Sequence, residues 1–211
     1  MARAKNLRRK RAVLAPAARV VIVTEGALTE PQYLRSFNFI HTGNSIKLVI
    51  RPVKGDPRRV VEEAVKEKES LRGDSLAAQD TVWAVFDRDV HARFAEAVDM
   101  AKANDIQLAI SNPCFEIWGV FHYRDFDAHV HRHDCQRELT SLCSSYSSSG
   151  SKVFDDSAAI ENGYRDAVAR AKNARKRRQE EGRPEGNPST RVYLLTEHIL
   201  KLFASRQLAG N

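Results

Sequence analysis

Short runs of apolar, β-branched residues alternate in the first half of the chain with segments whose apolar residues recur every three or four positions. The runs are typical of buried strands and the segments of amphipathic helices. Strands are expected at residues 19–24, 46–53, 81–86 and 106–110, and helices between them at residues 29–40, 58–71 and 92–104. This alternation, with short links, predicts an α/β fold with a doubly wound, mostly parallel four-stranded sheet and helices on both faces.

The pattern changes after residue 113 and becomes mainly helical. Helices are expected at residues 114–123, 136–145, 157–180 and 190–205, with a serine-rich loop at 144–151. Thr29 is expected to cap the first helix, with Pro31 in its first turn. The chain is therefore divided into a basic N-terminal arm, an α/β core and a mainly helical extension that packs on the core, at residues 1–18, 19–123 and 124–211.

Basic residues are concentrated in two clusters, and the net charge is +7. One cluster spans residues 3–11 and the other residues 170–183. Clustered lysine and arginine can neutralise phosphates, so nucleic acid is an expected partner. The candidate phosphate contacts in the second cluster are Arg175, Arg177 and Arg178. The alternative is a solvated tail and a solvated helix face.

The basic N-terminus is followed by a short apolar stretch that runs into the acidic Glu25. It lacks a convincing cleavage site, which favours an arm and a strand over a signal peptide. No segment approaches the ~20 apolar residues that span a bilayer. A cytoplasmic protein without membrane contact is expected.

Three cysteines are present, Cys114, Cys135 and Cys143. Their odd number and the absence of a CxxC pair argue against a disulfide framework and a structural zinc site. No adjacent base marks Cys114 as a nucleophile. Trp83 and Trp118 are expected in the core, not as base-stacking platforms.

Acidic residues follow two of the expected strands at the point where each ends. Glu25 and Gly26 follow the first strand, and Asp87-Arg88-Asp89 closes the third. The carboxyl ends of parallel strands collect functional side chains, and three nearby carboxylates repel one another unless a cation compensates them. Their hard oxygen atoms favour Mg²⁺ or Mn²⁺. Alternatively, Glu25 interacts with a helix dipole and an aspartate caps the next helix.

A metal at these acids would suit phosphoryl transfer. It would polarise a phosphodiester and lower the pKa of a bound water, while Gly26 would let the backbone approach a phosphate. Arg88, Lys54 or a residue of the second basic cluster would hold phosphates. The chain has no GxxxxGK[ST] run, so it is not itself a P-loop ATPase.

The histidines give weaker signals. His129, His131 and His133 alternate, as zinc ligands can, but no closing pair is visible and a solvated loop is favoured. His122 either reaches the acidic site or is a partly buried, aromatic-like residue.

Four blocks of sequence resemble the RloB family. They are VTEGALTEPQYL, WAVFDRD, AISNPCFEIW and NPSTRVYLL, and the resemblance runs roughly from Val20 to Phe203. That family is associated with phage-defence and abortive-infection operons and is assigned to the Toprim superfamily. The resemblance therefore implies a Toprim-like core.

By this resemblance, the glutamate of the Toprim pattern corresponds to Glu25, and its Asp-x-Asp motif corresponds to Asp87 and Asp89. By this resemblance the aspartates hold Mg²⁺, and the glutamate binds metal or transfers protons. Glu30 would support Glu25, and Glu116 would be a further ligand or would support one.

The resemblance also indicates candidate phosphate-binding residues in addition to the acidic residues. Asn112 belongs to the Ser-Asn-Pro block, and Asn187, Ser189 and Thr190 precede a helix N-terminus that suits a phosphate.

The implied function is a metal-dependent Toprim-type nuclease, acting on DNA or RNA in antiphage defence with an ATPase encoded nearby. One alternative is a non-catalytic Toprim-like subunit that binds nucleic acid or the ATPase. Another is an RNA-directed subunit of a larger complex. Whether the chain forms a homo-oligomer is left open.

Overall fold

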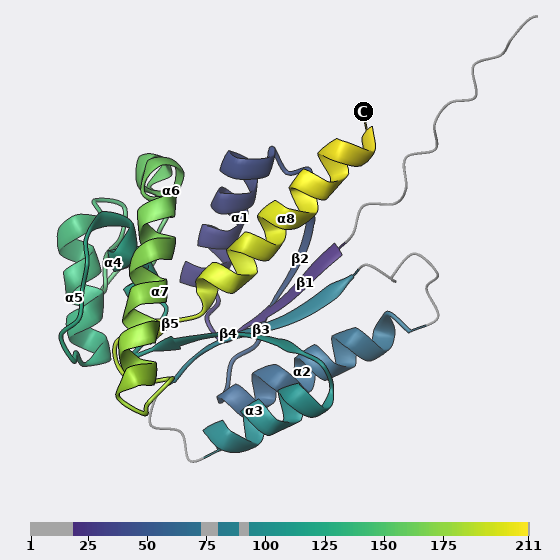
Figure 1. Cartoon of the computed structure of the whole chain (residues 1–211), viewed down its shortest axis with the longest axis horizontal. Helices are drawn as coiled ribbons and strands as arrows, with labels where there is room; N and C mark the ends of the chain where they lie inside the picture. The colour runs from purple at the N-terminus through teal and green to yellow at the C-terminus, as the bar shows by residue number, and fades with distance from the viewer. Residues whose placement is uncertain (1–18, 73–79, 89–92, 211) are drawn as a thin grey trace, which may run out of the picture.

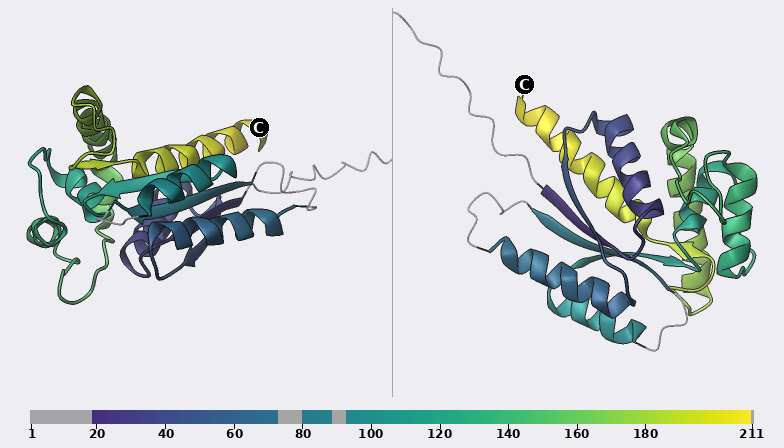
Figure 2. Two further views of the ribbon diagram at one scale, coloured as in Figure 1. Left: turned by 90° about the horizontal axis from the view of Figure 1, so that it is seen from below. Right: turned by 180° about the vertical axis from the view of Figure 1, so that it is seen from behind.

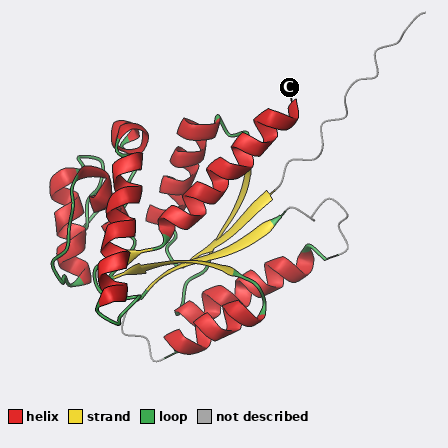
Figure 3. Ribbon diagram, viewed as in Figure 1, coloured by secondary structure: helices red, strands yellow, loops and turns green. Residues whose placement is uncertain are grey.

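A five-stranded sheet, ordered β2-β1-β3-β4-β5, lies at the centre of the molecule (Figures 1 and 3). The computed structural model describes residues 19–72, 80–88 and 93–210. Four strands run parallel and the short fifth is antiparallel to its neighbour. The strands are β1 (Arg19–Thr24), β2 (Lys47–Pro52), β3 (Thr81–Asp87), β4 (Gln107–Asn112) and β5 (Ser189–Thr190).

The four expected parallel strands are confirmed, but the expected total of four is wrong. The fifth strand pairs Ser111 with Thr190 and Asn112 with Ser189. The hydroxyl oxygens of Ser111 and Thr190 lie 2.8 Å apart, within hydrogen-bond distance. Two residues are too few to show strand periodicity, so this pairing could not be recognised from the pattern.

Helices cover both faces of the sheet, as expected (Figure 2). One face carries α2 (Pro57–Ser70) and α3 (Phe94–Ala103), and the other carries α1 (Thr29–Thr42) and α8 (Val192–Gly210). A group of further helices lies beside β5, namely α4 (Glu116–Tyr123), α5 (Arg132–Leu142), α6 (Ser157–Asn162) and α7 (Tyr164–Glu180). None of the helices in the described part of the chain has the length and apolar character needed to cross a membrane.

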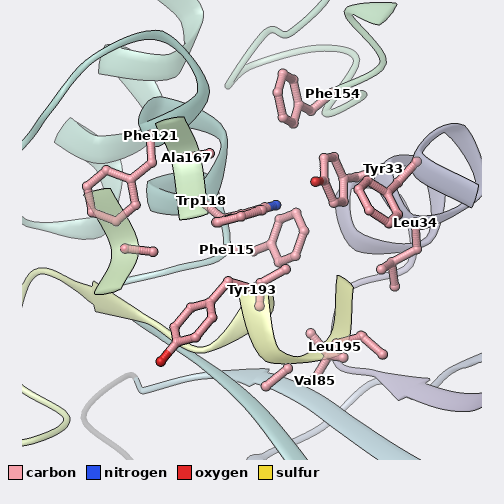
Figure 4. Close-up of a cluster of buried hydrophobic side chains, with 14 of the residues drawn as sticks. Tyr33, Leu34, Val85, Phe115, Trp118, Phe121, Phe154, Ala167, Tyr193 and Leu195 are labelled. Atoms are coloured by element: carbon pink, nitrogen blue, oxygen red, sulfur yellow. The ribbon is translucent and has the colours of Figure 1, made fainter. Parts of the chain in front are cut away.

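Each face of the sheet has its own apolar core. The larger core joins the sheet to α1, α4, α7 and α8, and Figure 4 shows Tyr33, Phe115, Trp118 and Phe154 within it. The smaller core lies under α2 and α3. Trp83 and Trp118 are both buried, as expected. The three cysteines are buried free thiols.

His122 is one of the polar groups buried in the larger core. Its Nδ1 lies 2.9 Å from the Trp118 carbonyl oxygen and its Nε2 lies 3.3 Å from the Tyr33 hydroxyl. Because a carbonyl only accepts, Nδ1 carries the proton and the Tyr33 hydroxyl donates to Nε2. Burial lowers the pKa of His122 to about 4, so the ring is neutral at pH 7. It acts as the aromatic-like core residue, the second of its two interpretations.

Three expected helix boundaries are wrong. The cap of α1 is Leu28, and the Thr29 hydroxyl instead donates to the Lys152 carbonyl at 2.8 Å. Helix α5 begins at Arg132, before the expected start at residue 136. The helix expected at 157–180 is interrupted at Gly163, which separates α6 from α7.

Gly163 permits a close approach between helices. A Cβ atom there would lie 2.5 Å from the His122 carbonyl oxygen and 2.7 Å from that of Ala159. Both atoms belong to the backbone and cannot rotate away, so only glycine fits without moving a helix.

We predict that Gly163→Ala lowers the free energy of unfolding by about 1–3 kcal/mol, the usual cost of overpacking. Urea denaturation followed by circular dichroism measures this. The control is Gly150→Ala, whose new Cβ would meet only the Ser147 side chain, at 3.3 Å. Equal stability of the two variants would contradict the steric explanation.

Candidate metal and phosphate site

Four carboxylates gather at the carboxyl edge of the sheet, and we call them the acid cluster. Glu25 follows β1, Asp87 ends β3, Glu30 lies in the first turn of α1, and Glu116 begins α4. Because β1 and β3 are parallel neighbours, their ends meet, and the Glu25 amide donates to the Val85 carbonyl at 3.0 Å. The expected meeting of Glu25 with Asp87 is therefore present.

Backbone amides hold two of these carboxylates. Glu25 Oε2 accepts from the Asp87 amide at 3.2 Å, and Glu30 Oε1 accepts from the Gly26 amide at 3.0 Å. A Cβ atom at Gly26 would lie 2.1 Å from Glu30 Oε2. In this structure, the group that approaches Gly26 closely is therefore a side-chain carboxylate.

Glu116 is held by side chains from the helical extension. The Tyr146 hydroxyl donates to its Oε1 at 2.6 Å, and Gln136 Nε2 lies 3.4 Å from the same oxygen. Glu116 is only 5% exposed, so these neighbours replace the water that a buried carboxylate loses.

Burial and mutual repulsion favour the protonated forms of Glu30 and Asp87. Burial raises the pKa of Glu30 to about 7, and the charges of Glu116 and Glu25 add to the increase. Burial also raises the pKa of Asp87 well above its ordinary value, and the three other carboxylates raise it further. Arg132 opposes this effect, because its Nη2 lies 3.5 Å from Asp87 Oδ2.

The donor chemistry of the acid cluster fits a hard divalent cation. All four groups offer oxygen atoms, and a cation would relieve their repulsion. Among the described residues, no three histidine, cysteine or acidic side chains are arranged to hold one ion. Mg²⁺ usually binds through one or two carboxylates, water and substrate phosphate, so Glu25 and Asp87 suffice as a partial ligand set. The predicted ligand Asp89 lies outside the described residues.

A cleft of about 980 Å³ opens beside the acid cluster, and we call it the β4 cleft. Arg88, Asn112 and Asn187, three of the expected phosphate contacts, line it together with Arg132. Arg88 Nη1 and Asn112 Nδ2 both donate to the Glu185 carbonyl, at 2.5 and 2.7 Å. These bonds attach the loop that forms one wall of the cleft to the ends of β3 and β4.

Other expected phosphate contacts lie away from this cleft. Ser189 and Thr190 are buried within β5. Lys54 lines a separate groove at the end of β2. Together with the contacts that line the cleft, these expected phosphate contacts therefore lie in three different places, namely the β4 cleft, the buried strand β5 and the groove at the end of β2.

The three arginines of the second basic cluster that are candidate phosphate contacts have partners within the protein. Arg178 is buried, with its Nη2 2.6 Å from Glu181 Oε1, and Arg177 Nε lies 2.9 Å from Asp127 Oδ1. Arg175 donates to the Tyr193 hydroxyl at 3.1 Å. These contacts orient the three guanidinium groups toward other parts of the protein.

Sequence patterns missed three residues that contact the acid cluster, namely Arg132, Gln136 and Tyr146. They lie on or after α5, and only tertiary packing brings them to the sheet edge. Two of the alternating histidines, His129 and His131, line the β4 cleft.

Comparison with known families gives a match over residues 20–199 to the family model described as RloB-like protein. The chain belongs to the RloB-like family. No curated protein and no solved structure matches it. In this RloB-like protein the matched region contains the whole acid cluster and every residue that lines the β4 cleft.

We predict that Glu30→Gln reduces the pH dependence of stability, measured in EDTA. The pKa of Glu30 is about 7 when folded, against an ordinary value of 4.5, so the folded state binds the proton more tightly. The wild-type protein therefore loses stability as the pH rises from about 4.5 to above 7, by ~3 kcal/mol at most from this group.

Chemical denaturation between pH 4.5 and pH 8.5 should show the smaller decline in Glu30→Gln. The control is Glu161→Gln, an exposed acid on α6 that should follow the wild-type curve. Identical curves for wild type and Glu30→Gln would contradict the assigned burial and repulsion.

Proposed function

We propose that this RloB-like protein is a metal-dependent nuclease of the Toprim type, which cleaves phosphodiester bonds in DNA or RNA. The observation that carries the proposal is the acid cluster at neighbouring ends of parallel strands, directly beside a cleft lined with cationic side chains. An acidic centre next to phosphate-binding groups is the arrangement that metal-assisted phosphoryl transfer needs.

In this proposal Glu25, Asp87 and Asp89 would hold Mg²⁺ or Mn²⁺, with Glu116 as a further ligand. The bound cation supplies Lewis acidity toward the phosphate and lowers the pKa of water. The deep position of Asp87, which is 8% exposed, limits competing water at its carboxylate.

Glu25 is the most accessible acid of the cluster, since the other three are buried. It is therefore the group best placed to accept a proton from an attacking water. The Asp87 amide donates to Glu25 Oε2 at 3.2 Å and fixes the orientation of that carboxylate.

Arg88 and Arg132 would position the substrate phosphate. Arg88 is the residue after Asp87, and Arg132 contacts Asp87 directly. Both guanidinium groups border the β4 cleft, so a phosphate bound there would lie next to the acid cluster. Arginine can bind two phosphate oxygens at once, which would restrict the orientation of the scissile bond.

The biological setting of the proposal comes from the family. RloB-like genes are associated with phage defence and commonly lie beside an ATPase gene, so we propose a defence effector in the cytoplasm that works with an ATPase. Because the chain has no P-loop motif, nucleotide hydrolysis would belong to that partner.

A non-catalytic subunit that binds nucleic acid or the ATPase is the second candidate. The raised pKa values of Glu30 and Asp87 favour it, because protonation and the Arg132 contact can stabilise the cluster without a cation. The two candidates differ in the role of the acids. In the nuclease they are needed for cleavage, whereas in the non-catalytic subunit they contribute only to folding.

We predict that Asp87→Asn lowers the cleavage rate at least ~100-fold, the scale on which single electrostatic contributions act in active sites. The assay uses single- and double-stranded DNA and RNA with Mg²⁺ or Mn²⁺, with and without the neighbouring ATPase. Calorimetric titration with Mn²⁺ gives a readout independent of activity and should show weaker binding.

Asp99→Asn, which changes an exposed aspartate on α3, is the matched control and should cleave like the wild type. Cleavage by Asp87→Asn at the wild-type rate would refute the active-site assignment. Nucleic-acid binding without cleavage by any combination, unchanged by EDTA, would support the non-catalytic candidate.

A further inference from the structure

A second basic depression lies on the opposite side of the acid cluster from the β4 cleft, and we call it the β2 groove. Its volume is about 620 Å³, and it lies between the end of β2, the start of α2 and the residue before α3. Five basic and three acidic side chains line it. Its lining is therefore net positive, like that of the β4 cleft.

The acids of the β2 groove are already paired. Asp56 pairs with Arg93, Glu62 lies 3.2 Å from Arg58, and Glu63 lies 3.1 Å from Lys66. These pairs use three of the five cations, and the remaining two face the groove with their charge available.

Those two cations are Lys54 and Arg59. Both are exposed, and neither forms an ion pair with any residue that the structure describes. An anion in the groove would therefore gain two cationic contacts without breaking an existing pair. The neighbouring acid cluster, and the β4 cleft beyond it, indicate that this anion is a nucleic-acid phosphate.

The order of the strands places the groove and the cleft on either side of the acids. Along the carboxyl edge come the β2 groove, the ends of β1 and β3 with the acid cluster, and then the β4 cleft. The groove adjoins the cluster, because the Val53 amide donates to the Thr24 carbonyl, one residue before Glu25, at 2.8 Å. The cleft adjoins the acid cluster through Arg88. The distance from β2 to β4 is roughly 14 Å, which corresponds to three inter-strand spacings.

We infer that a single-stranded polynucleotide lies across this edge, with one limb in the β2 groove and the other in the β4 cleft. The phosphodiester between the limbs faces the acid cluster, so the strand passes through and needs no free end. Cleavage at that internal position rests on the proposed function, whereas binding does not.

The recessed position of the acids favours a single strand over a duplex. Glu30, Asp87 and Glu116 are each at most 8% exposed, so a phosphate must descend between the flanking walls to reach them. A duplex is stiff over the length of this site, while a single strand bends at each nucleotide. The contacts are to phosphate, so DNA and RNA share this chemistry, and their 2′ positions distinguish them.

The first test measures binding of labelled single-stranded DNA and RNA by fluorescence anisotropy in EDTA. Lys54→Glu/Arg59→Glu should weaken binding at least ~10-fold at low salt and reduce the salt slope by about 1.4, the value for two lost phosphate contacts on a single strand. The matched control is Lys47→Glu/Arg72→Glu. It makes the same charge changes at two exposed residues on the far side of the same elements, because Lys47 begins β2 and Arg72 lies just after the end of α2.

The control should bind within twofold of the wild type, and thermal melting checks that both variants are folded. If the groove variant is unfolded, Lys54→Gln/Arg59→Gln replaces it and should show a smaller loss in the same direction. Equal affinity of groove variant and control would overturn the assignment of the groove.

The second test compares a closed circular single strand with a linear strand of the same sequence. Circles should bind as tightly as linear strands and, if the protein is a nuclease, should be opened internally. Binding that requires a free end would overturn the inference. A third outcome separates the two proposals. If the groove variant loses binding but neither it nor the wild type cleaves any strand, the β2 groove remains assigned as a binding site and only the proposed nuclease activity is refuted.

Discussion

Mutual repulsion among the carboxylates of the acid cluster is the constraint around which the rest of the site is arranged. Parallel pairing of β1 with β3 brings Glu25 beside Asp87, and the starts of two helices add Glu30 and Glu116. Backbone amides and a tyrosine hydroxyl accommodate three of these groups, while Arg132 supplies a compensating charge 3.5 Å from Asp87. Protonation or a nearby positive charge relieves such repulsion.

The helical extension is more than a cover for the core. It contributes Arg132 to Asp87, and Gln136 and Tyr146 to Glu116. It also forms one wall of the β4 cleft. The acids themselves come from the α/β core, so the chemistry of the site is shared between the two halves of the sequence.

The strands that carry the site could be predicted because each is a run of apolar, β-branched residues that ends abruptly in a polar group. Strand β5 could not, since two residues carry no period. Arg132 was also missed, because its approach to Asp87 depends on how α5 packs and not on any local signal.

The basic helix α7 illustrates a limit of reading charge from composition. Its arginines suggested phosphate contacts, and two of them also have acidic partners, one close in sequence, Glu181 beside Arg178, and one distant, Asp127 beside Arg177. Charge counted along a chain does not reveal pairing in space. The family resemblance was most informative for Glu116, which no periodicity or spacing singles out but which the structure places with the other acids.

The late position of β5 in the sequence has a consequence for biosynthesis. The acids are all translated by residue 116, but the contacts that attach the wall of the β4 cleft to the sheet come later, from the Glu185 carbonyl, from β5 and from the Arg191 amide. A chain still emerging from the ribosome therefore has its acidic residues long before it has a complete cleft.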